Sequence, residues 1–329
     1  MQLRTAAKGL AYAGVAAAAI GGALWAAEVV AARNLRRRPD PDGNDILAPL
    51  DLPRTSVRSF DGADINVVDV GAGSPIVLVH GVTLSLRTWT RQYDALVAAG
   101  HRVIAIDQRG HGDSSVGDEG HAVEHLGDDV AAVMVGLDLR DAVLVGHSMG
   151  GIAVQSFATR HADATRERVR GLVLLSTLCR TPGGSQAMRL RSSVERLTRH
   201  SPDTTALWNT KNVGLLLARL GFGRDPSPSE VELVRQMLRD CPNDTRVHAP
   251  RALIGMDLTD DIAKIETPTL IVCGTADTIT PPFHARQLHR AIDGSRIEWV
   301  EGGGHMLMLE RTDWLNATLI AFAAEVSTQ

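Results

Sequence analysis

A serine stands between glycines in the segment GHSMG at residues 146–150, directly after the apolar run AVLVGH at 142–147. This G-x-S-x-G pattern is typical of a sharp strand-to-helix turn that lifts the serine hydroxyl above the edge of a sheet. A serine hydroxyl is a weak nucleophile until a neighbouring base removes its proton. The pattern therefore predicts nucleophilic catalysis by Ser148, provided that the rest of the chain supplies a base and an acid to orient it.

Candidates for both partners occur later in the chain, each directly after an apolar run. The segment CGTADTITPP places Asp277 just past TLIVCG at 269–274, and GGGH places His305 just past RIEWVE at 296–301. A histidine oriented by a carboxylate is the usual base for a serine nucleophile. No carboxylate follows the preceding apolar run, GLVLLS, so Asp277 has no rival as the acid. We predict that Ser148, His305 and Asp277 form a catalytic triad.

Two backbone N–H groups are candidates for the oxyanion hole that such a reaction needs. Donors already aimed at the oxyanion of a tetrahedral intermediate each contribute roughly 10²–10³ in rate. The N–H of Met149, directly after the serine, is one candidate. The other is the N–H of Val82, because the segment LVHGVTLS leaves a predicted strand and Gly81 permits the chain to turn there.

These residues need a sheet whose strands all end at one edge. Nearly continuous apolar runs are typical of parallel strands buried on both faces, and helical periodicity lies between several of them, for example at 121–137. The sequence predicts an α/β fold with a mostly parallel eight-stranded sheet and helices on both faces. The predicted strands are 56–60, 64–70, 75–80, 102–107, 142–147, 171–176, 269–274 and 296–301.

A long insertion interrupts the alternation of strands and helices. Residues 178–266 contain helical patterns but no strand pattern, and an insertion of this length predicts a helical lid. Its segment GLLLARLGF at 214–222, together with Leu253, Ile254 and Met256, is expected to line an apolar acyl pocket.

Residues 1–35 predict a membrane anchor or a signal segment. The run at 10–32 carries Glu28 as its only charge, and as a helix it would span about 34 Å, enough for a hydrocarbon core of about 30 Å. We predict a single-pass N-terminal transmembrane helix; flanking arginines favour a cytoplasmic body. A cleaved signal peptide, leaving a secreted enzyme, and a soluble or membrane-surface helix are alternatives. Residues 36–53 predict a linker, and the catalytic domain is predicted over 54–329.

Composition argues against several other classes of function. The net charge is −4 and no basic stripe occurs in the body of the chain, so no nucleic-acid partner is expected. Three cysteines without a C-x-x-C pair predict neither a disulfide framework nor a zinc-finger site.

One motif competes with the serine chemistry. His121, Glu124 and His125 fit the H-x-x-E-H pattern of a family of zinc peptidases. The same residues are the expected solvated first turn of the predicted helix 121–137, and we favour that interpretation. We expect no metal and no organic cofactor.

Five motifs in this order resemble the α/β-hydrolase fold family over roughly 54–329: VHG, DQRGHGDS, GHSMGG, GTADTITPP and GGGHMLMLE. The sequence is most similar to the lidded serine esterase and lipase members and to their haloperoxidase-like branch. The resemblance implies a structural role, at the rim of the pocket, for the matching residues of the second motif: Asp107, Arg109, Gly110, Gly112 and Ser114.

Differences from the family narrow the expected reaction. Ser148 stands where the family's epoxide hydrolases and dehalogenases have aspartate, Met149 where dehalogenases usually have tryptophan, and Met306 where carbon–carbon bond hydrolases often have tryptophan. The resemblance then implies hydrolysis of a carboxylic ester, of a small molecule or a lipid, through an acyl-enzyme. A cofactor-free perhydrolase or haloperoxidase-like enzyme, a thioesterase, a carbon–carbon bond hydrolase and a non-catalytic ligand-binding protein are the alternatives.

Overall fold

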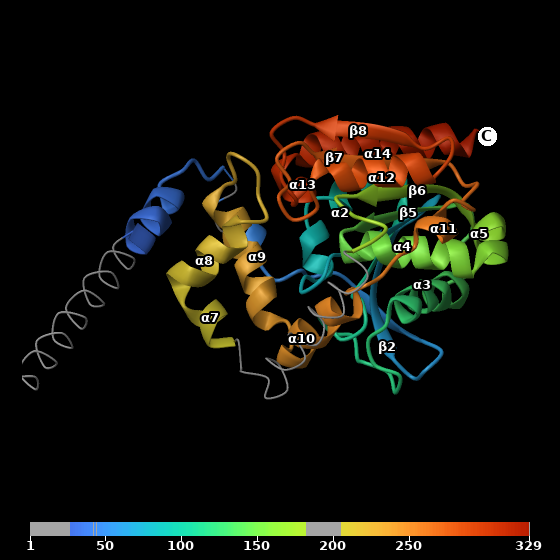
Figure 1. Cartoon of the computed structure of the whole chain (residues 1–329), viewed down its shortest axis with the longest axis horizontal. Coiled ribbons are helices and arrows are strands. Elements are labelled where there is room, and N and C mark those ends of the chain that lie inside the picture. Colours follow the sequence, from blue (N-terminus) through green and yellow to red (C-terminus); the bar gives the residue numbers. More distant parts are fainter. Residues whose placement is uncertain (1–26, 42, 44, 182–204, 329) are drawn as a thin grey trace, which may run out of the picture.

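A mostly parallel eight-stranded sheet runs through the centre of the computed structural model, which describes residues 27–41, 43, 45–181 and 205–328 (Figure 1). The strand order is β1-β2-β4-β3-β5-β6-β7-β8, and β2 is antiparallel to both of its neighbours. The predicted sheet is thus confirmed. The strands are β1 (Arg54–Arg58), β2 (Asp64–Gly71), β3 (Pro75–Val79), β4 (Arg102–Ile106), β5 (Ala142–His147), β6 (Val169–Leu175), β7 (Thr269–Gly274) and β8 (Arg296–Val300).

Helices cover both faces of the sheet, and this explains the apolar runs. Along β5, Val143 and Val145 pack into one core while Leu144 packs into the other. One core includes residues of α2 (Tyr93–Ala98) and α14 (Thr312–Ser327), and the other includes residues of α3 (Val123–Gly136), α4 (Met149–Arg160) and α12 (Pro282–Ala291). A strand between two apolar layers has no polar face, as the sequence predicted.

Close packing between β3, β5 and α4 requires glycine at the serine turn. A β-carbon on Gly150 would lie 2.2 Å from the carbonyl oxygen of Val79, and one on Gly146 would lie 2.4 Å from the carbonyl oxygen of Gly150. Both distances are far below van der Waals contact, so a larger residue at either position would push α4 away from the sheet. The two glycines hold the turn against the carboxyl ends of the strands.

The insertion between β6 and β7 is helical in its described part. Figure 1 shows α7 to α10 to one side of the sheet. Residues 182–204 of the predicted lid lie outside the described residues. Ser227 and Glu230 form a capping box at the start of α9. The helices are α7 (Thr205–Asn209), α8 (Lys211–Arg219), α9 (Pro228–Asp240), α10 (Asn243–Ala252) and α11 (Thr259–Ile262).

The N-terminal part of the described chain packs against this insertion. Residues 27–36 are helical, and Arg36 donates a hydrogen bond of 2.9 Å to Asn212 of α8. In the segment 36–53, predicted as a linker, Ile46 is buried in the core. Most of the predicted membrane segment lies outside the described residues, and within the described ranges we find no helix with the length and hydropathy needed to cross a bilayer.

Candidate active site

Ser148 has a strained backbone at the junction of β5 and α4. Its φ of 53° and ψ of −117° place a non-glycine residue in a sparsely populated region, which costs of order 1–3 kcal/mol. The surrounding chain holds this conformation: the Ser148 N–H donates to the carbonyl of Leu175 at 3.0 Å, and the Thr177 hydroxyl donates to the Ser148 carbonyl at 2.6 Å. The turn predicted from the glycine spacing is present.

Asp277 and His305 form a hydrogen-bonded pair. His305 Nδ1 lies 2.9 Å from Asp277 Oδ2, and both side chains are buried. Asp277 also accepts the N–H groups of Ile279 and Thr280 and the Thr280 hydroxyl. Burial opposes ionisation of this carboxyl, but the His305 contact and the other donors outweigh it, so the pKa of Asp277 lies below its usual value. Asp277 therefore supplies a fixed negative charge that orients His305 through Nδ1, leaving Nε2 as the reactive nitrogen.

The main chain of His305 is held from two further directions. Its N–H donates to the carbonyl of Gly221 in the insertion at 2.9 Å. Its carbonyl lies 2.9 Å from Nε2 of His147, the residue before the serine. Burial lowers the pKa of His147 well below the usual histidine value, so this imidazole is neutral; because a carbonyl only accepts, its single proton lies on Nε2. The sequence analysis did not identify this role of His147.

Ser148 and His305 both line one cavity of about 330 Å³ beneath the insertion. Among the described residues no hydrogen bond joins the Ser148 hydroxyl to His305, and such a bond often forms only in the complex with substrate. Most of the remaining lining is apolar. It includes Val82, Leu84, Trp208, Leu217, Ala218, Leu220, Val234, Leu238, Ile279 and Met306.

Of the two residues predicted to supply the oxyanion-hole N–H groups, Met149 follows Ser148 directly and Val82 lines its cavity. Met149 is the first residue of α4, so its N–H has no acceptor within the helix. Val82 follows β3 and lines the same cavity as Ser148. The β-carbon of Ser148 lies 3.1 Å from the point that a β-carbon on Gly81 would occupy, which places the loop after β3 directly beside the nucleophile.

Of the residues predicted to line an acyl pocket, some line the cavity of Ser148 and others do not. Leu217, Ala218 and Leu220, from the segment 214–222, do line the cavity. Leu253, Ile254 and Met256 do not. Met256 instead packs with Val123 and Ile152, because the chain after α10 turns back over α3 and α4 before it enters β7. Val234 and Leu238 of α9 line the cavity instead of Leu253, Ile254 and Met256.

His121, Glu124 and His125 do not converge on one point. His125 Nε2 faces Glu119 at 3.2 Å, Glu124 is exposed, and His121 lines a separate surface cavity. No group of three or more potential ligands that could hold a metal is present in the described ranges.

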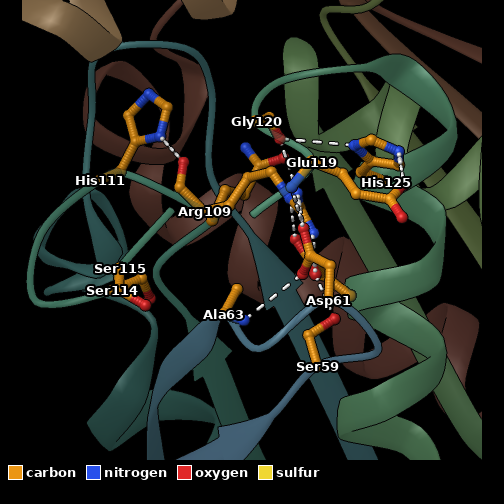
Figure 2. A network of polar contacts seen from close by, with 12 residues as sticks. Ser59, Asp61, Ala63, Arg109, His111, Ser114, Ser115, Glu119, Gly120 and His125 are labelled. Atoms are coloured by element: carbon orange, nitrogen blue, oxygen red, sulfur yellow. Dashed lines mark hydrogen bonds and ion pairs between the residues drawn. The ribbon is translucent and has the colours of Figure 1, made fainter. Parts of the chain in front are cut away.

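None of the residues of the DQRGHGDS motif lines the cavity of Ser148 and His305. Figure 2 shows Arg109 of this motif within a network of polar contacts that includes Asp61 and Gly120. Arg109 is fully buried and pairs with Asp129 at 2.7 Å and with Asp61 at 3.0 Å. Asp107 accepts the N–H of Leu86 at 2.8 Å, and the Ser114 hydroxyl donates to the carbonyl of Asp107 at 2.6 Å. Their contacts are those of a scaffold that holds the neighbouring turns.

Comparison with known proteins agrees with this fold. The family described as "Alpha/beta hydrolase family" matches residues 76–318. A non-heme haloperoxidase of Rhodococcus erythropolis is 32% identical, with 81% of this chain and 98% of the relative covered. The AB hydrolase superfamily protein YisY of Bacillus subtilis is 29% identical, with 81% and 98% covered.

Solved structures give the same result. An esterase from Exiguobacterium antarcticum superposes with a TM-score of 0.71 at 25% identity, covering 82% of this chain and 99% of the esterase. An enol-lactonase from Burkholderia xenovorans LB400 superposes with a TM-score of 0.68 at 25% identity, covering 83% and 100%. About four fifths of this chain therefore shares its fold with nearly the full length of each of these solved structures.

Proposed function

Because the chain belongs to the alpha/beta hydrolase family, we propose that it is a serine hydrolase that cleaves carboxylic esters through an acyl-enzyme. The observation that carries the proposal is the shared cavity of Ser148 and His305, with the His305–Asp277 pair at 2.9 Å behind it. A strained nucleophile turn, a histidine and a fixed carboxylate at one apolar cavity are the parts that acyl transfer needs.

The reaction follows from the positions of these groups. Ser148 Oγ attacks the ester carbonyl while His305 Nε2 accepts its proton, and the oxyanion receives hydrogen bonds from the N–H groups of Val82 and Met149. The intermediate collapses as His305 returns the proton to the leaving alcohol. Water then attacks the acyl-enzyme with His305 again as the base, which releases the carboxylic acid and restores Ser148.

The lining of the cavity favours an ester of an apolar acid. The side chains contributed by α8 and α9 to this cavity, Leu217, Ala218, Val234 and Leu238, are all apolar. Burial of each methylene of an acyl chain there contributes about 0.8 kcal/mol to binding. We propose acyl chains of several carbons as the substrates in preference to acetyl groups. A membrane anchor, which would favour lipid esters, stays a prediction from the sequence.

Removal of the nucleophile tests the proposal. Ser148→Ala should fold as the wild type does and lose ester hydrolysis by a factor on the order of 10⁴–10⁶, as triad deletions do. Wild-type protein treated with a fluorophosphonate should gain one adduct by intact-mass spectrometry, and the variant none. Turnover of p-nitrophenyl esters by Ser148→Ala would refute the assignment.

A second activity is supported by the names of several relatives. Proteins described as non-heme haloperoxidases or chloroperoxidases are 29–32% identical to this chain over most of its length. Such chemistry could use the same Ser148, with hydrogen peroxide in place of water attacking the acyl-enzyme to give a peracid. Bromination of monochlorodimedone in the presence of peroxide and acetate, lost in Ser148→Ala, would indicate this activity; ester hydrolysis without bromination would limit the protein to hydrolysis.

A further inference from the structure

Glu310, the last residue of α13 (Leu307–Glu310), places its carboxylate against three backbone N–H groups. The Gly223 N–H donates to Oε2 at 2.7 Å, the Met306 N–H donates to Oε1 at 3.1 Å, and the Gly304 N–H reaches both oxygens at 3.0–3.1 Å. Two of these residues, Gly304 and Met306, are the neighbours of His305 on either side.

The same carboxylate connects the catalytic loop to the insertion. Gly223 belongs to the turn after α8, and two residues earlier the carbonyl of Gly221 accepts the N–H of His305 at 2.9 Å. The two segments are in close contact, since a β-carbon on Gly223 would lie 2.3 Å from the carbonyl oxygen of Gly302. Residues 221–223 and 302–306 are therefore joined directly by the His305–Gly221 hydrogen bond and indirectly through the carboxylate of Glu310, which accepts N–H groups from both segments.

We propose that Glu310 is a positioning residue for the proposed hydrolysis: by accepting the N–H groups on both sides of His305 and that of Gly223, it fixes His305 and ties it to the lid. This inference rests on the proposed function, because Glu310 acts only through His305, the proposed catalytic base. Its consequence is that the alignment of His305 with Ser148 depends on the lid segment being in place.

The chemistry of the side chain explains why glutamate suits this position. A carboxylate offers acceptor sites on two oxygens, which is enough for three N–H groups. Glutamine would direct an NH₂ group at one or more of these N–H donors, and aspartate would be one methylene too short to reach them. Burial raises the pKa of Glu310 above its usual value, and the three N–H donors offset part of that rise.

The matched test compares Glu310→Gln and Glu310→Asp with Glu230→Gln. Glu230 lies in the insertion, away from His305; like Glu310 it accepts a backbone N–H, that of Ser227, at 2.9 Å, and it does not line the cavity. Each variant is characterised by kcat and KM for a p-nitrophenyl ester, by the rate of fluorophosphonate labelling and by urea unfolding. The fraction of reactive enzyme is measured by the adduct yield, so that kcat refers to folded protein only.

Misplacement of a catalytic group by about 1 Å costs about 100-fold in rate, so kcat per reactive site should fall by about 10- to 100-fold in both Glu310 variants. KM should stay within about threefold, since Glu310 does not contact substrate, and Glu230→Gln should keep the wild-type kcat. A purely structural Glu310 would lower stability but leave kcat per reactive site unchanged, which would overturn the inference.

Three other results would also overturn the inference. Full activity in Glu310→Asp would show that only the charge matters, and an equal kcat loss in Glu230→Gln would show that any cap in the lid has this effect. A wild-type kcat in both Glu310 variants would refute the positioning role alone, provided that the wild type is labelled and Ser148→Ala is inactive. Failure of those two controls would refute the proposed function instead.

Discussion

Gly81 is the residue at which the nucleophile, the oxyanion loop and His147 come closest together. A β-carbon there would lie 2.9 Å from His147 Nδ1 and 3.1 Å from the β-carbon of Ser148. Neither neighbour can retreat easily, because Ser148 lies in a strained turn and His147 is held by the carbonyl of His305. Even one additional methyl group at this position must therefore displace the loop that carries Val82.

We predict that Gly81→Ala lowers kcat/KM for esters by about 100-fold, the cost of losing one oxyanion donor, while the protein stays folded. Steady-state kinetics and urea unfolding measure the two effects separately. Gly294→Ala is the control: it adds a methyl group in open space, at a φ of 67°, and should lower stability without changing kcat. Equal kinetics for Gly81→Ala and the wild type would contradict the placement of the oxyanion loop.

Single residues differ in how far the sequence reveals their roles. Ser148, Asp277 and His305 could be identified because each follows a recognisable buried strand, and the carboxyl ends of parallel strands meet at one edge. Glu310 could not, since its partners are backbone N–H groups of two loops whose paths the side-chain pattern does not specify. The role of His147 was hidden for the same reason: its partner is a backbone carbonyl far away in the sequence.

At the scale of elements, α8 and α9 supply apolar lining to the cavity, and under the proposed function this is the part that would discriminate between acyl chains. Leu217 and Ala218 of α8 and Val234 and Leu238 of α9 line the same cavity as Ser148. These helices belong to the insertion rather than to the sheet, so substrate preference and catalytic chemistry lie on separate parts of the chain.

Narrowing this part of the cavity should change chain-length preference. Leu238→Trp should lower kcat/KM for hexanoyl and longer esters by about tenfold, the cost of about 1.4 kcal/mol of lost or strained contacts, with a smaller effect on acetyl esters. Arg239→Trp introduces the same ring one position further along α9, outside the cavity lining, and should leave the preference unchanged. A parallel decrease for all chain lengths in Leu238→Trp would contradict the acyl-pocket assignment.

The elements themselves were predicted with unequal success. All eight predicted strands are present, although β1 begins at Arg54 rather than at residue 56. The pattern is strongest for β3, β5 and β7, which are buried along their whole length; the exposed edge strand β1 leaves a weaker one. The helical character of the insertion was also predicted. The path of the insertion was not predicted. An amphipathic sequence shows that one face of a helix is buried, but it does not show which part of the protein covers that face. Met256, for example, packs beside Val123 and does not line the cavity.

At the scale of the whole molecule, neutral buried histidines make stability depend on pH. Burial lowers the pKa of His80 to about 4 and that of His111 to about 3, from an ordinary 6.5. His111 Nε2 accepts the N–H of Thr83 at 3.0 Å, a bond that a protonated ring could not accept. Between pH 6.5 and the folded-state pKa, the unfolded chain binds a proton that the folded chain does not, so each such histidine makes folding less favourable as pH falls.

We predict that the difference in unfolding free energy between wild type and His111→Gln shrinks by about 1.4 kcal/mol from pH 7.5 to pH 5.5. The wild type loses this amount as its unfolded state takes up a proton on His111, and the variant has no such group. Urea unfolding at both pH values measures it. A difference that stays constant between the two pH values would mean that His111 titrates alike in both states.

The backbone of Ser148 sets a limit on how this protein can be improved. Its torsion angles suit glycine better than serine, so selection for heat resistance alone would favour a residue that cannot attack an ester. As long as serine is retained at this position, interactions elsewhere in the fold must offset the strain energy of its backbone. Under the proposed function, greater thermal stability must therefore come from substitutions in distant parts of the scaffold, away from Ser148.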